Sequence, residues 1–415
     1  MNNLETIVLD NGLTVYLYLD QRRHSTFFQF NTLCGGLTKH FRYDGKDISL
    51  QDGVAHILEH YIVECNEKGN FLEELGHKQM ATNASTSPFV TNYYFETVEN
   101  VLFGIRTMLE GIYHVPFTKE KLEKLKNPIY QEVRGKLDNK FYHANRVRLT
   151  NLFNHIDFRD VGGTLEEIEK TTVQDIETFY HAFYQPYNQF IVIAGNFNKE
   201  EVIQEIKNFY QNTEIEKHEV SLIPYLEEKE IVKSEDSFEF STPLPYAELS
   251  FKLDVSHYSS EELLDLDFYL HSFYSSSFGT TSVLHKQLID QKIINDYIQY
   301  GDVMIENYII ISIGAYTNDS KKFKKAVLEE IKNLQHLDEE KFELDKKNSI
   351  VQIILRDENI FKMIMPFINN IIFYHYPYLD TVDDVVKLTY QQYKDVIHSL
   401  DFSQFTYLEI QKPKL

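Results

Sequence analysis

The 415-residue sequence predicts an α+β fold made of two tandem, homologous units, each a mainly antiparallel sheet with helices packed on one face. Three observations lead to this prediction. The chain is too long for one ordinary hydrophobic core. Two pairs of its segments repeat in the same order, and both halves mix strand-like alternation with helical periodicity. We expect a first unit at residues 1–215, a linker at 216–238 and a second unit at 239–415.

The internal repeat consists of two matched pairs of segments. GTLEEIEKTTVQD at residues 163–175 matches DTVDDVVKLTYQQ at 380–392, and upstream NPIYQEV at 127–133 matches NSIVQII at 348–354. One such match can arise by chance, but two in the same order and at nearly the same spacing hardly can. The chain therefore contains two copies of one structural unit.

The elements of each unit follow from local patterns. Asn11-Gly12, between alternating apolar and polar residues, predicts a hairpin over residues 6–19. In order, we then expect a strand at 27–33, helices at 51–65 and 70–76, strands at 80–85 and 91–97, helices at 98–114 and 118–139, and a closing strand at 189–196. The second unit should repeat this order, with a strand at 247–253, a helix at 260–275, and strands near Tyr297 and Tyr308.

Composition narrows the functional class. The net charge of −22 disfavours nucleic acid and anionic membranes as partners, because both attract a basic surface. The two cysteines, Cys34 and Cys65, supply no disulfide framework, which fits a reducing compartment. The sequence begins without the features of a signal peptide and contains no apolar run long enough to span a bilayer, so we expect a cytoplasmic protein.

The stretch GVAHILEHYIVEC, residues 53–65, carries the candidate chemistry. On a helix, His56 and His60 lie one turn apart on one face, so that a nitrogen of each ring can reach one metal ion. Glu59 leans toward the same point and could take a proton from an attacking water molecule. The order H-x-x-E-H is the inverzincin motif. The alternative, two hydrogen-bonded core histidines, would bury three polar groups at a cost of several kcal/mol.

A catalytic zinc usually has three protein ligands, and the repeat indicates the third. In the matched segments at 127–133 and 348–354, Glu132 stands opposite Ile353, whereas the other positions are alike or apolar. The second unit also lacks H-x-x-E-H in its expected helix at 260–275. Because both features are missing together, Glu132 is the expected third ligand; the alternative is an ordinary acid on a helix surface.

These motifs resemble the pitrilysin, insulinase and mitochondrial-processing-peptidase family of zinc metallopeptidases, in particular its short bacterial members with two repeats. The similar segments are LDNGLTV, GVAHILEH, NASTSPFVTNYYF, FTKEKLEKLKNPIYQEV and the stretch from GGTLEEIEK to FIVIAGN. Together they cover nearly the whole chain and are highly specific. The resemblance implies one zinc ion per chain on His56, His60 and Glu132, with Glu59 as the general base.

The resemblance also implies how a peptide is held. The strand around residues 80–86 would be a sheet edge to which an extended peptide adds as another strand, with Asn83, Ala84 and Ser85 as substrate-binding residues. Family subunits of this length contain two such units, and two subunits close around a peptide chamber.

Two departures from the family pattern bear on activity and on partners. Leu125 stands where the family often has a second glutamate, seven residues before the ligand. The second unit keeps Tyr297 or Tyr300 but has no arginine at 285–300, where many members have an arginine–tyrosine pair that holds the substrate carbonyl. We therefore expect a homologous subunit to supply that pair in a heterodimer, or a second copy of this chain to complete a homodimer.

Two classes of function remain. The first is a zinc-dependent endopeptidase that cleaves extended peptides in a closed chamber, for turnover or for trimming a leader or precursor, as the catalytic subunit of a dimer. The alternative is a non-catalytic peptide-binding or assembly subunit of a processing peptidase complex. The complete set of His56, Glu59, His60 and Glu132 favours the enzyme.

Overall fold

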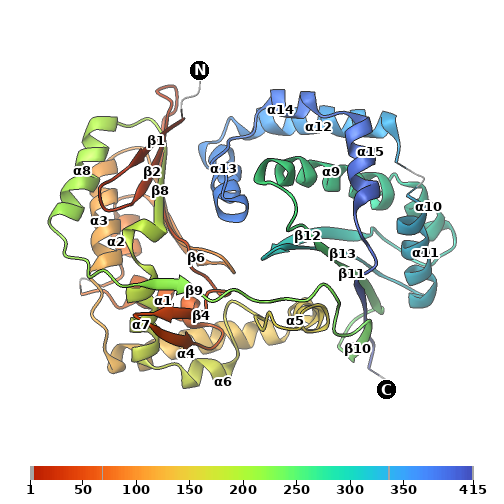
Figure 1. Ribbon diagram of the computed structural model, residues 1–415, viewed down its shortest axis with the longest axis horizontal. Coiled ribbons are helices and arrows are strands. Elements are labelled where there is room, and N and C mark those ends of the chain that lie inside the picture. Colours follow the sequence, from red (N-terminus) through yellow and green to blue (C-terminus); the bar gives the residue numbers. More distant parts are fainter. Residues whose placement is uncertain (1–3, 68, 335–336, 414–415) are drawn as a thin grey trace. The chain divides into compact units, whose positions relative to one another are not determined.

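The computed structural model describes residues 4–67, 69–334 and 337–413, and contacts divide the chain into two compact units (Figure 1). The first unit comprises Met1–Lys136, Phe158–Pro224 and Asn359–Ile368. The second comprises Leu137–Asp157, Tyr225–Glu358 and Asn369–Leu415. Neither unit is continuous in sequence, because α5 (Lys140–Leu152) packs against β14 (Phe405–Gln411) in the second unit.

The first unit contains a six-stranded sheet in the order β1-β2-β8-β3-β7-β6. Its strands are β1 (Leu4–Val8), β2 (Thr14–Leu19), β3 (Thr26–Thr32), β6 (Ala81–Thr86), β7 (Thr91–Thr97) and β8 (Gln189–Gly195). All neighbours pair antiparallel except β2 and β8. Every residue of β3 and β8 is buried, whereas β6 is partly exposed along its whole length. As an edge strand, β6 has one side free for a further strand.

Helices cover this sheet with regularly spaced apolar residues. They are α1 (Val54–Glu64), α2 (Phe71–His77), α3 (Val101–Tyr113), α4 (Lys119–Leu137), α6 (Leu165–Lys170), α7 (Val173–Phe183) and α8 (Lys199–Gln211). In α3, Ile105, Met108, Leu109 and Ile112 follow the i, i+3, i+4, i+7 spacing of one helix face, and all four are completely buried. Figure 1 shows α3 and α8 together on the same side of the strands.

The second unit has a five-stranded sheet in the order β10-β14-β11-β13-β12. Besides β14, its strands are β10 (Glu235–Glu239), β11 (Tyr246–Asp254), β12 (Gln299–Ile305) and β13 (Tyr308–Tyr316). Besides α5, its helices are α9 (Ser260–Phe278), α10 (Val283–Asp290), α11 (Ser320–Asn333), α12 (Glu339–Arg356), α14 (Val382–Lys387) and α15 (Tyr390–Ser399). The remaining helix, α13 (Ile360–Tyr374), is divided between the two units.

The repeat found in the sequence corresponds to a repeat of elements. The order β2-β8-β3-β7-β6 parallels β10-β14-β11-β13-β12, and in each sheet the first of these pairs is the parallel one. The matched segments also start their helices in the same way. Thr164 and Thr381 form capping boxes before α6 and α14, and Thr172 and Thr389 form them before α7 and α15. The predicted α+β fold with mainly antiparallel sheets is confirmed.

A small third sheet differs from the expectation. It joins β5 (Lys46–Ser49), β4 (His40–Tyr43) and β9 (Val220–Leu222), which were not predicted as strands. The stretch 216–238, expected to be a linker, thus contributes β9 and most of β10. All three strands are short. The partner of β9 lies far away in the sequence, whereas β4 and β5 form a hairpin at Asp44-Gly45, a local signal that was overlooked in the sequence.

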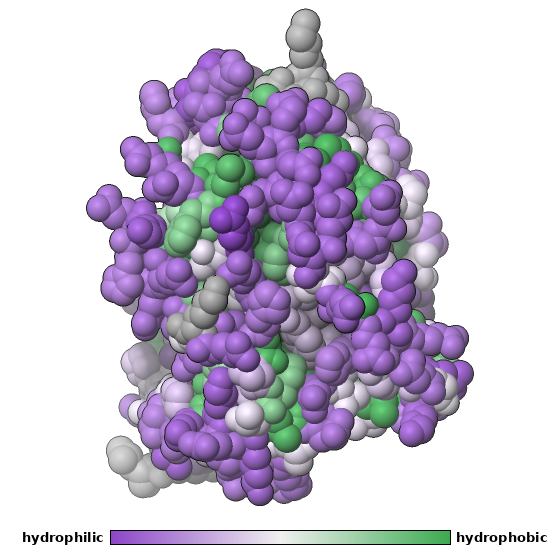
Figure 2. Space-filling model, turned by 90° about the vertical axis from the view of Figure 1, so that its left-hand side faces the viewer, coloured by the Kyte–Doolittle hydropathy of each residue, from purple (hydrophilic) through white to green (hydrophobic). Residues whose placement is uncertain are grey.

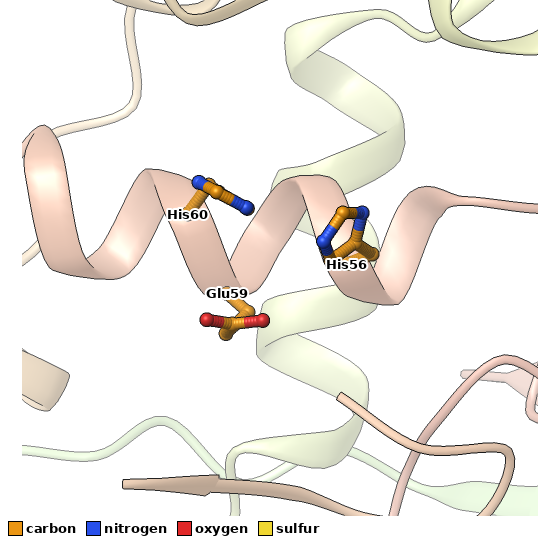
Figure 3. A group of neighbouring side chains, drawn as sticks. All are labelled: His56, Glu59 and His60. Atoms are coloured by element: carbon orange, nitrogen blue, oxygen red, sulfur yellow. The ribbon is translucent and has the colours of Figure 1, made fainter. Parts of the chain in front are cut away.

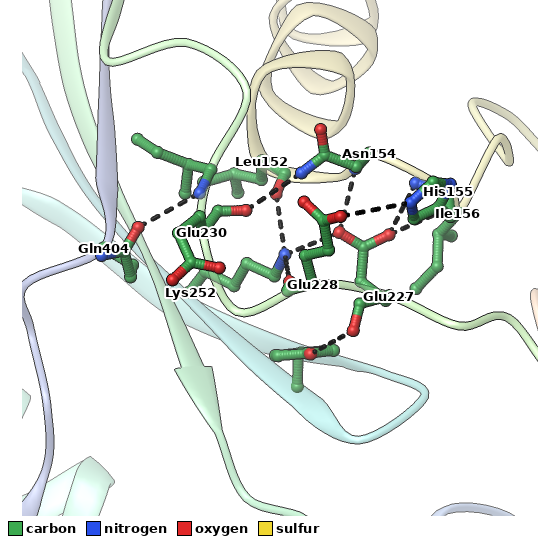
Figure 4. A network of polar contacts seen from close by, with 11 residues as sticks. Leu152, Asn154, His155, Ile156, Glu227, Glu228, Glu230, Lys252 and Gln404 are labelled. Carbon is green, nitrogen blue, oxygen red and sulfur yellow. Dashed lines mark hydrogen bonds and ion pairs between the residues drawn. The ribbon is translucent and has the colours of Figure 1, made fainter.

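A buried ion pair anchors this stretch to β11 (Figure 4). Lys252 Nζ on β11 lies 2.8 Å from Glu227 Oε1 and donates to the carbonyl oxygens of Leu152 and Glu228. The Glu227 carboxylate also accepts backbone N–H groups from residues 154–156. The side chains of Lys252 and Glu227 are 0% and 3% exposed, so each charge depends on these partners.

The polarity of the surface and the burial of the two cysteines are two further features of the fold. On the face shown in Figure 2, hydrophilic residues predominate and hydrophobic ones form separate patches. Across the described ranges, no helix combines the length and apolar character needed to cross a membrane.

Cys34 and Cys65 are both buried, and burial raises the pKa of each thiol, to about 11 for Cys65.

Candidate active site

The helix that carries the H-x-x-E-H motif begins at a close backbone contact. Gly53, the N-cap of α1, has a φ of 93°, and a Cβ atom there would lie 2.8 Å from the carbonyl oxygen of Gly162. The preceding Asp52 accepts hydrogen bonds from Lys39 Nζ at 2.6 Å and from the backbone N–H of Arg159 at 3.1 Å. These contacts fix the start of α1 against the 158–163 loop, and with it the directions of the motif side chains.

Two helices bring the four predicted residues together. The Nε2 atoms of His56 and His60 on α1 each lie 3.5 Å from Oε2 of Glu132 on α4. His56, Glu59 and His60 project from about one turn of α1 (Figure 3) and offer ligand atoms within 4.8 Å of one another. No other group of three or more histidine, cysteine or acidic residues in the described ranges has this geometry.

A cavity of about 450 Å³ contains all seven residues singled out from the sequence. His56, Glu59, His60 and Glu132 line it together with Asn83, Ala84 and Ser85 from the edge strand β6. The backbone N–H of Ala84 bonds to the Asn83 side chain at 3.0 Å, and the alternation of ladder bonds from Ser87–Val90 places the Ala84–Tyr93 pair at a non-hydrogen-bonded position. This donor therefore belongs to the free side of the sheet, where an added strand would bind.

Burial and charge give the two histidines different properties. Burial lowers the pKa of His56 to about 4, so its ring is neutral near pH 7. Burial acts in the same direction on His60, but hydrogen bonds to Glu132 and Glu64 outweigh it and raise its pKa to about 10. The hydrogen bond with His60, opposed by burial and aided by charge attraction to His56, lowers the pKa of Glu132 to about 2. Glu132 is thus an anion aimed at the two rings.

Glu59 differs from Glu132 in its surroundings. It is 7% exposed, and burial raises the pKa of its carboxyl group. The hydroxyl of Thr86 on β6 donates to Glu59 Oε2 at 3.0 Å and holds the carboxylate in place. A carboxylate with a raised pKa is a stronger base, which is what proton transfer near neutral pH requires.

Three contacting residues were not predicted from the sequence as parts of the site. Thr86 bonds to Glu59, Glu64 Oε1 lies 3.1 Å from His60 Nδ1, and Lys136 Nζ lies 2.9 Å from Glu132 Oε1. Glu64 and Lys136 each follow a proposed ligand by four positions on the same helix, and this spacing is the signal that could have found them. Leu125, where the family often has a second glutamate, is a buried core residue.

The donor set fits zinc. Ligand atoms of a tetrahedral zinc with bonds of about 2.0–2.1 Å lie roughly 3.3 Å apart, close to the 3.5 Å between Glu132 Oε2 and each ring nitrogen. The other ring nitrogen of His56, Nδ1, is buried and has no hydrogen-bond partner among the described residues. His56, His60 and Glu132 would hold the ion, and Glu59 would stand beside it.

Comparison with known proteins bears on the relationships of the whole chain and not on the individual site residues. A family model described as "Peptidase M16 inactive domain" matches residues 170–349, a range that begins after Glu132 and contains none of the four site residues. A relative from Bacillus subtilis (strain 168), named as the zinc protease YmfH, is 24% identical over 352 residues, which are 82% of this chain and 81% of the relative.

Solved structures show the same fold over the whole chain. An M16-like peptidase from Alicyclobacillus acidocaldarius superposes with a TM-score of 0.90 at 20% identity, covering 99% of this chain and 98% of that one. The periplasmic protease PqqL from Escherichia coli gives a TM-score of 0.76 at 16% identity, covering 99% of this chain and 48% of that chain. The family model, the relative and the shared fold agree with the metal-binding motif, and together they support a relationship to the M16 peptidase family.

Proposed function

We propose that this chain is a zinc-dependent endopeptidase that cleaves extended peptides. The observation that carries the proposal is that Glu132 Oε2 lies 3.5 Å from Nε2 of both His56 and His60, with the buried carboxylate of Glu59 beside them. The name of the Bacillus relative as a zinc protease supports the same chemistry.

Each group of the site would have its own role in peptide hydrolysis. When bound, zinc would polarise the scissile carbonyl and acidify a water molecule next to it. Glu59 takes a proton from the attacking water and returns it to the leaving amine. Thr86 keeps the Glu59 carboxylate oriented through its hydroxyl.

Substrate would bind as an additional strand on β6. The outer edge of Asn83, Ala84 and Ser85 lies in the same cavity as Glu59, so a peptide paired there has its backbone beside the reacting groups. Main-chain hydrogen bonds hold any extended sequence, which suits an enzyme that processes or trims peptides.

The cofactor assignment can be tested without any substrate. Glu132→Ala should reduce zinc affinity by more than the 10–100-fold typical of a lost outer-shell partner, because it removes a direct ligand. Zinc content and competition with a chromophoric chelator measure this. Glu120→Ala, at an exposed position of the same helix, is the matched control and should bind zinc like the parent. Equal affinity in both variants would exclude Glu132 as a ligand.

We also propose that the active form is a dimer, with the zinc-bearing chain paired to a homologous subunit or to itself. The match to 48% of the longer PqqL chain supports it, since that protein contains this fold within a chain about twice as long. If the partner is a homologous subunit, the chain purified alone should cleave a mixed peptide library only weakly, whereas a homodimer should be active without any other protein. Cleavage mapped by mass spectrometry, with light scattering for the oligomeric state, provides the measurement. Full activity as a monomer would remove the need for a partner.

A non-catalytic peptide-binding subunit is the second candidate. The family model that matches residues 170–349 is described as inactive, which favours this alternative for the second unit. Under it, the protein would bind extended peptides through β6 and leave them intact even with zinc bound. Peptide capture without any product in the mass spectrum would support this alternative over the enzyme.

A further inference from the structure

We infer that Glu64 is a positioning residue for His60, which it orients for metal binding through a hydrogen bond to the far side of the ring. The inference rests on the proposed zinc site and concerns how this chain maintains that site. Glu64 Oε1 lies 3.1 Å from His60 Nδ1, one helical turn further along α1.

The two nitrogens of His60 face different groups. Nε2 is the atom 3.5 Å from Glu132, whereas Nδ1 faces Glu64. An imidazole that donates its Nδ1–H to a carboxylate carries its free lone pair on Nε2, the nitrogen aimed at the metal position. The carboxylate also makes the ring a better electron donor. When the ion replaces the proton on Nε2, Glu64 therefore keeps the remaining proton on Nδ1 and orients the ring.

His60 needs this support more than His56 does. The side chain of His56 is 10% exposed, so packing restricts its ring, and its Nδ1 has no partner among the described residues. The side chain of His60 is 26% exposed and has more freedom to rotate. A hydrogen bond supplies for His60 the restraint that burial supplies for His56.

The position of Glu64 is poor for helix stability. It is the last residue of α1, where the helix dipole disfavours an acidic side chain by about 0.3–1 kcal/mol. Its side chain is 40% exposed and lines the active-site cavity. An acid at this end of the helix is therefore better explained by its contact with His60 than by the stability of α1.

The test compares zinc affinity in Glu64→Ala, Glu64→Gln and Glu67→Gln. Glu67 is exposed, three residues further along, and its variant changes the net charge in the same way. Glu64→Ala should weaken zinc binding by about 10–100-fold. Glu64→Gln keeps an acceptor but loses the charge, so its zinc affinity should lie between those of Glu64→Ala and the parent. The zinc affinity of Glu67→Gln should equal that of the parent. Circular dichroism checks that each variant is folded.

A second readout follows the ring itself. In the zinc-loaded parent, the His60 Nδ1 proton should give a downfield NMR signal that exchanges slowly with water, and Glu64→Ala should lose it while the His56 signals stay. Zinc affinity within twofold of the parent in Glu64→Ala, or an unchanged Nδ1 signal, would overturn the inference. If the parent itself binds no zinc, the proposed function fails, an outcome distinct from either of these.

Discussion

Glu59→Gln should leave zinc bound and lower the rate of peptide cleavage by a factor of about 100 to 10,000, the usual contribution of a general acid–base group. Glutamine has the size of glutamate and can still accept the Thr86 hydroxyl, so the cavity keeps its shape. It cannot take a proton from water. Zinc analysis together with the cleavage rate of a mixed peptide library separates loss of chemistry from loss of metal.

The control for Glu59→Gln is Glu73→Gln, an exposed acid on the neighbouring helix α2. This variant should cleave at the rate of the parent, because Glu73 does not line the active-site cavity. A Glu59→Gln protein that cuts as fast as the parent would show that the assigned mechanism is wrong. Loss of zinc in that variant would instead assign Glu59 to the metal.

Lys252→Met should destabilise the second unit by about 3–5 kcal/mol, the range for breaking a buried ion pair by removing one partner. Methionine fills much of the volume but leaves the Glu227 carboxylate buried without a cation. The carbonyl oxygens of Leu152 and Glu228 also lose their donor. The ammonium further lies over the rings of Phe153 and Tyr308, at 4.8 and 4.6 Å, and these contacts disappear as well.

The free energy of unfolding in urea measures this loss, and Lys229→Met provides the comparison. Lys229 pairs with Asp401 at 2.9 Å, but both side chains are about half exposed, so this pair should contribute less than about 1 kcal/mol. Similar midpoints for the two variants would show that water or structural relaxation compensates the buried carboxylate, contrary to the expectation.

Much of the fold could be predicted because its signals are local. The H-x-x-E-H helix expected at 51–65 is α1, and the strand expected at 91–97 is β7 with the same bounds. The duplicated segments were recognisable because they contain helix caps, such as Thr164 and Thr381, whose hydroxyls start the same helix in each copy. In the third sheet, β9 gave no signal because its partner β4 lies across most of the first unit, whereas the β4–β5 hairpin was overlooked despite its Asp44-Gly45 turn.

The site could be predicted where the chemistry constrains the spacing. Two histidines four residues apart lie on one face of any helix, and Glu132 stood out because its counterpart in the repeat is Ile353. Glu64 and Lys136 each follow a proposed ligand by four positions, but many charged residues on helix surfaces share this spacing, so it did not single them out. Only the three-dimensional position of the partner ring or carboxylate shows what they contact.

The burial of both native thiols has a practical use. Because neither sulfur is accessible and both resist ionisation, maleimide reagents should react selectively with a cysteine engineered at an exposed site. Spin labels or fluorophores could then be attached in pairs, one in each half, without first removing any natural cysteine. The inter-label distance, followed as peptide is added, would report directly on whether the two halves approach each other during turnover.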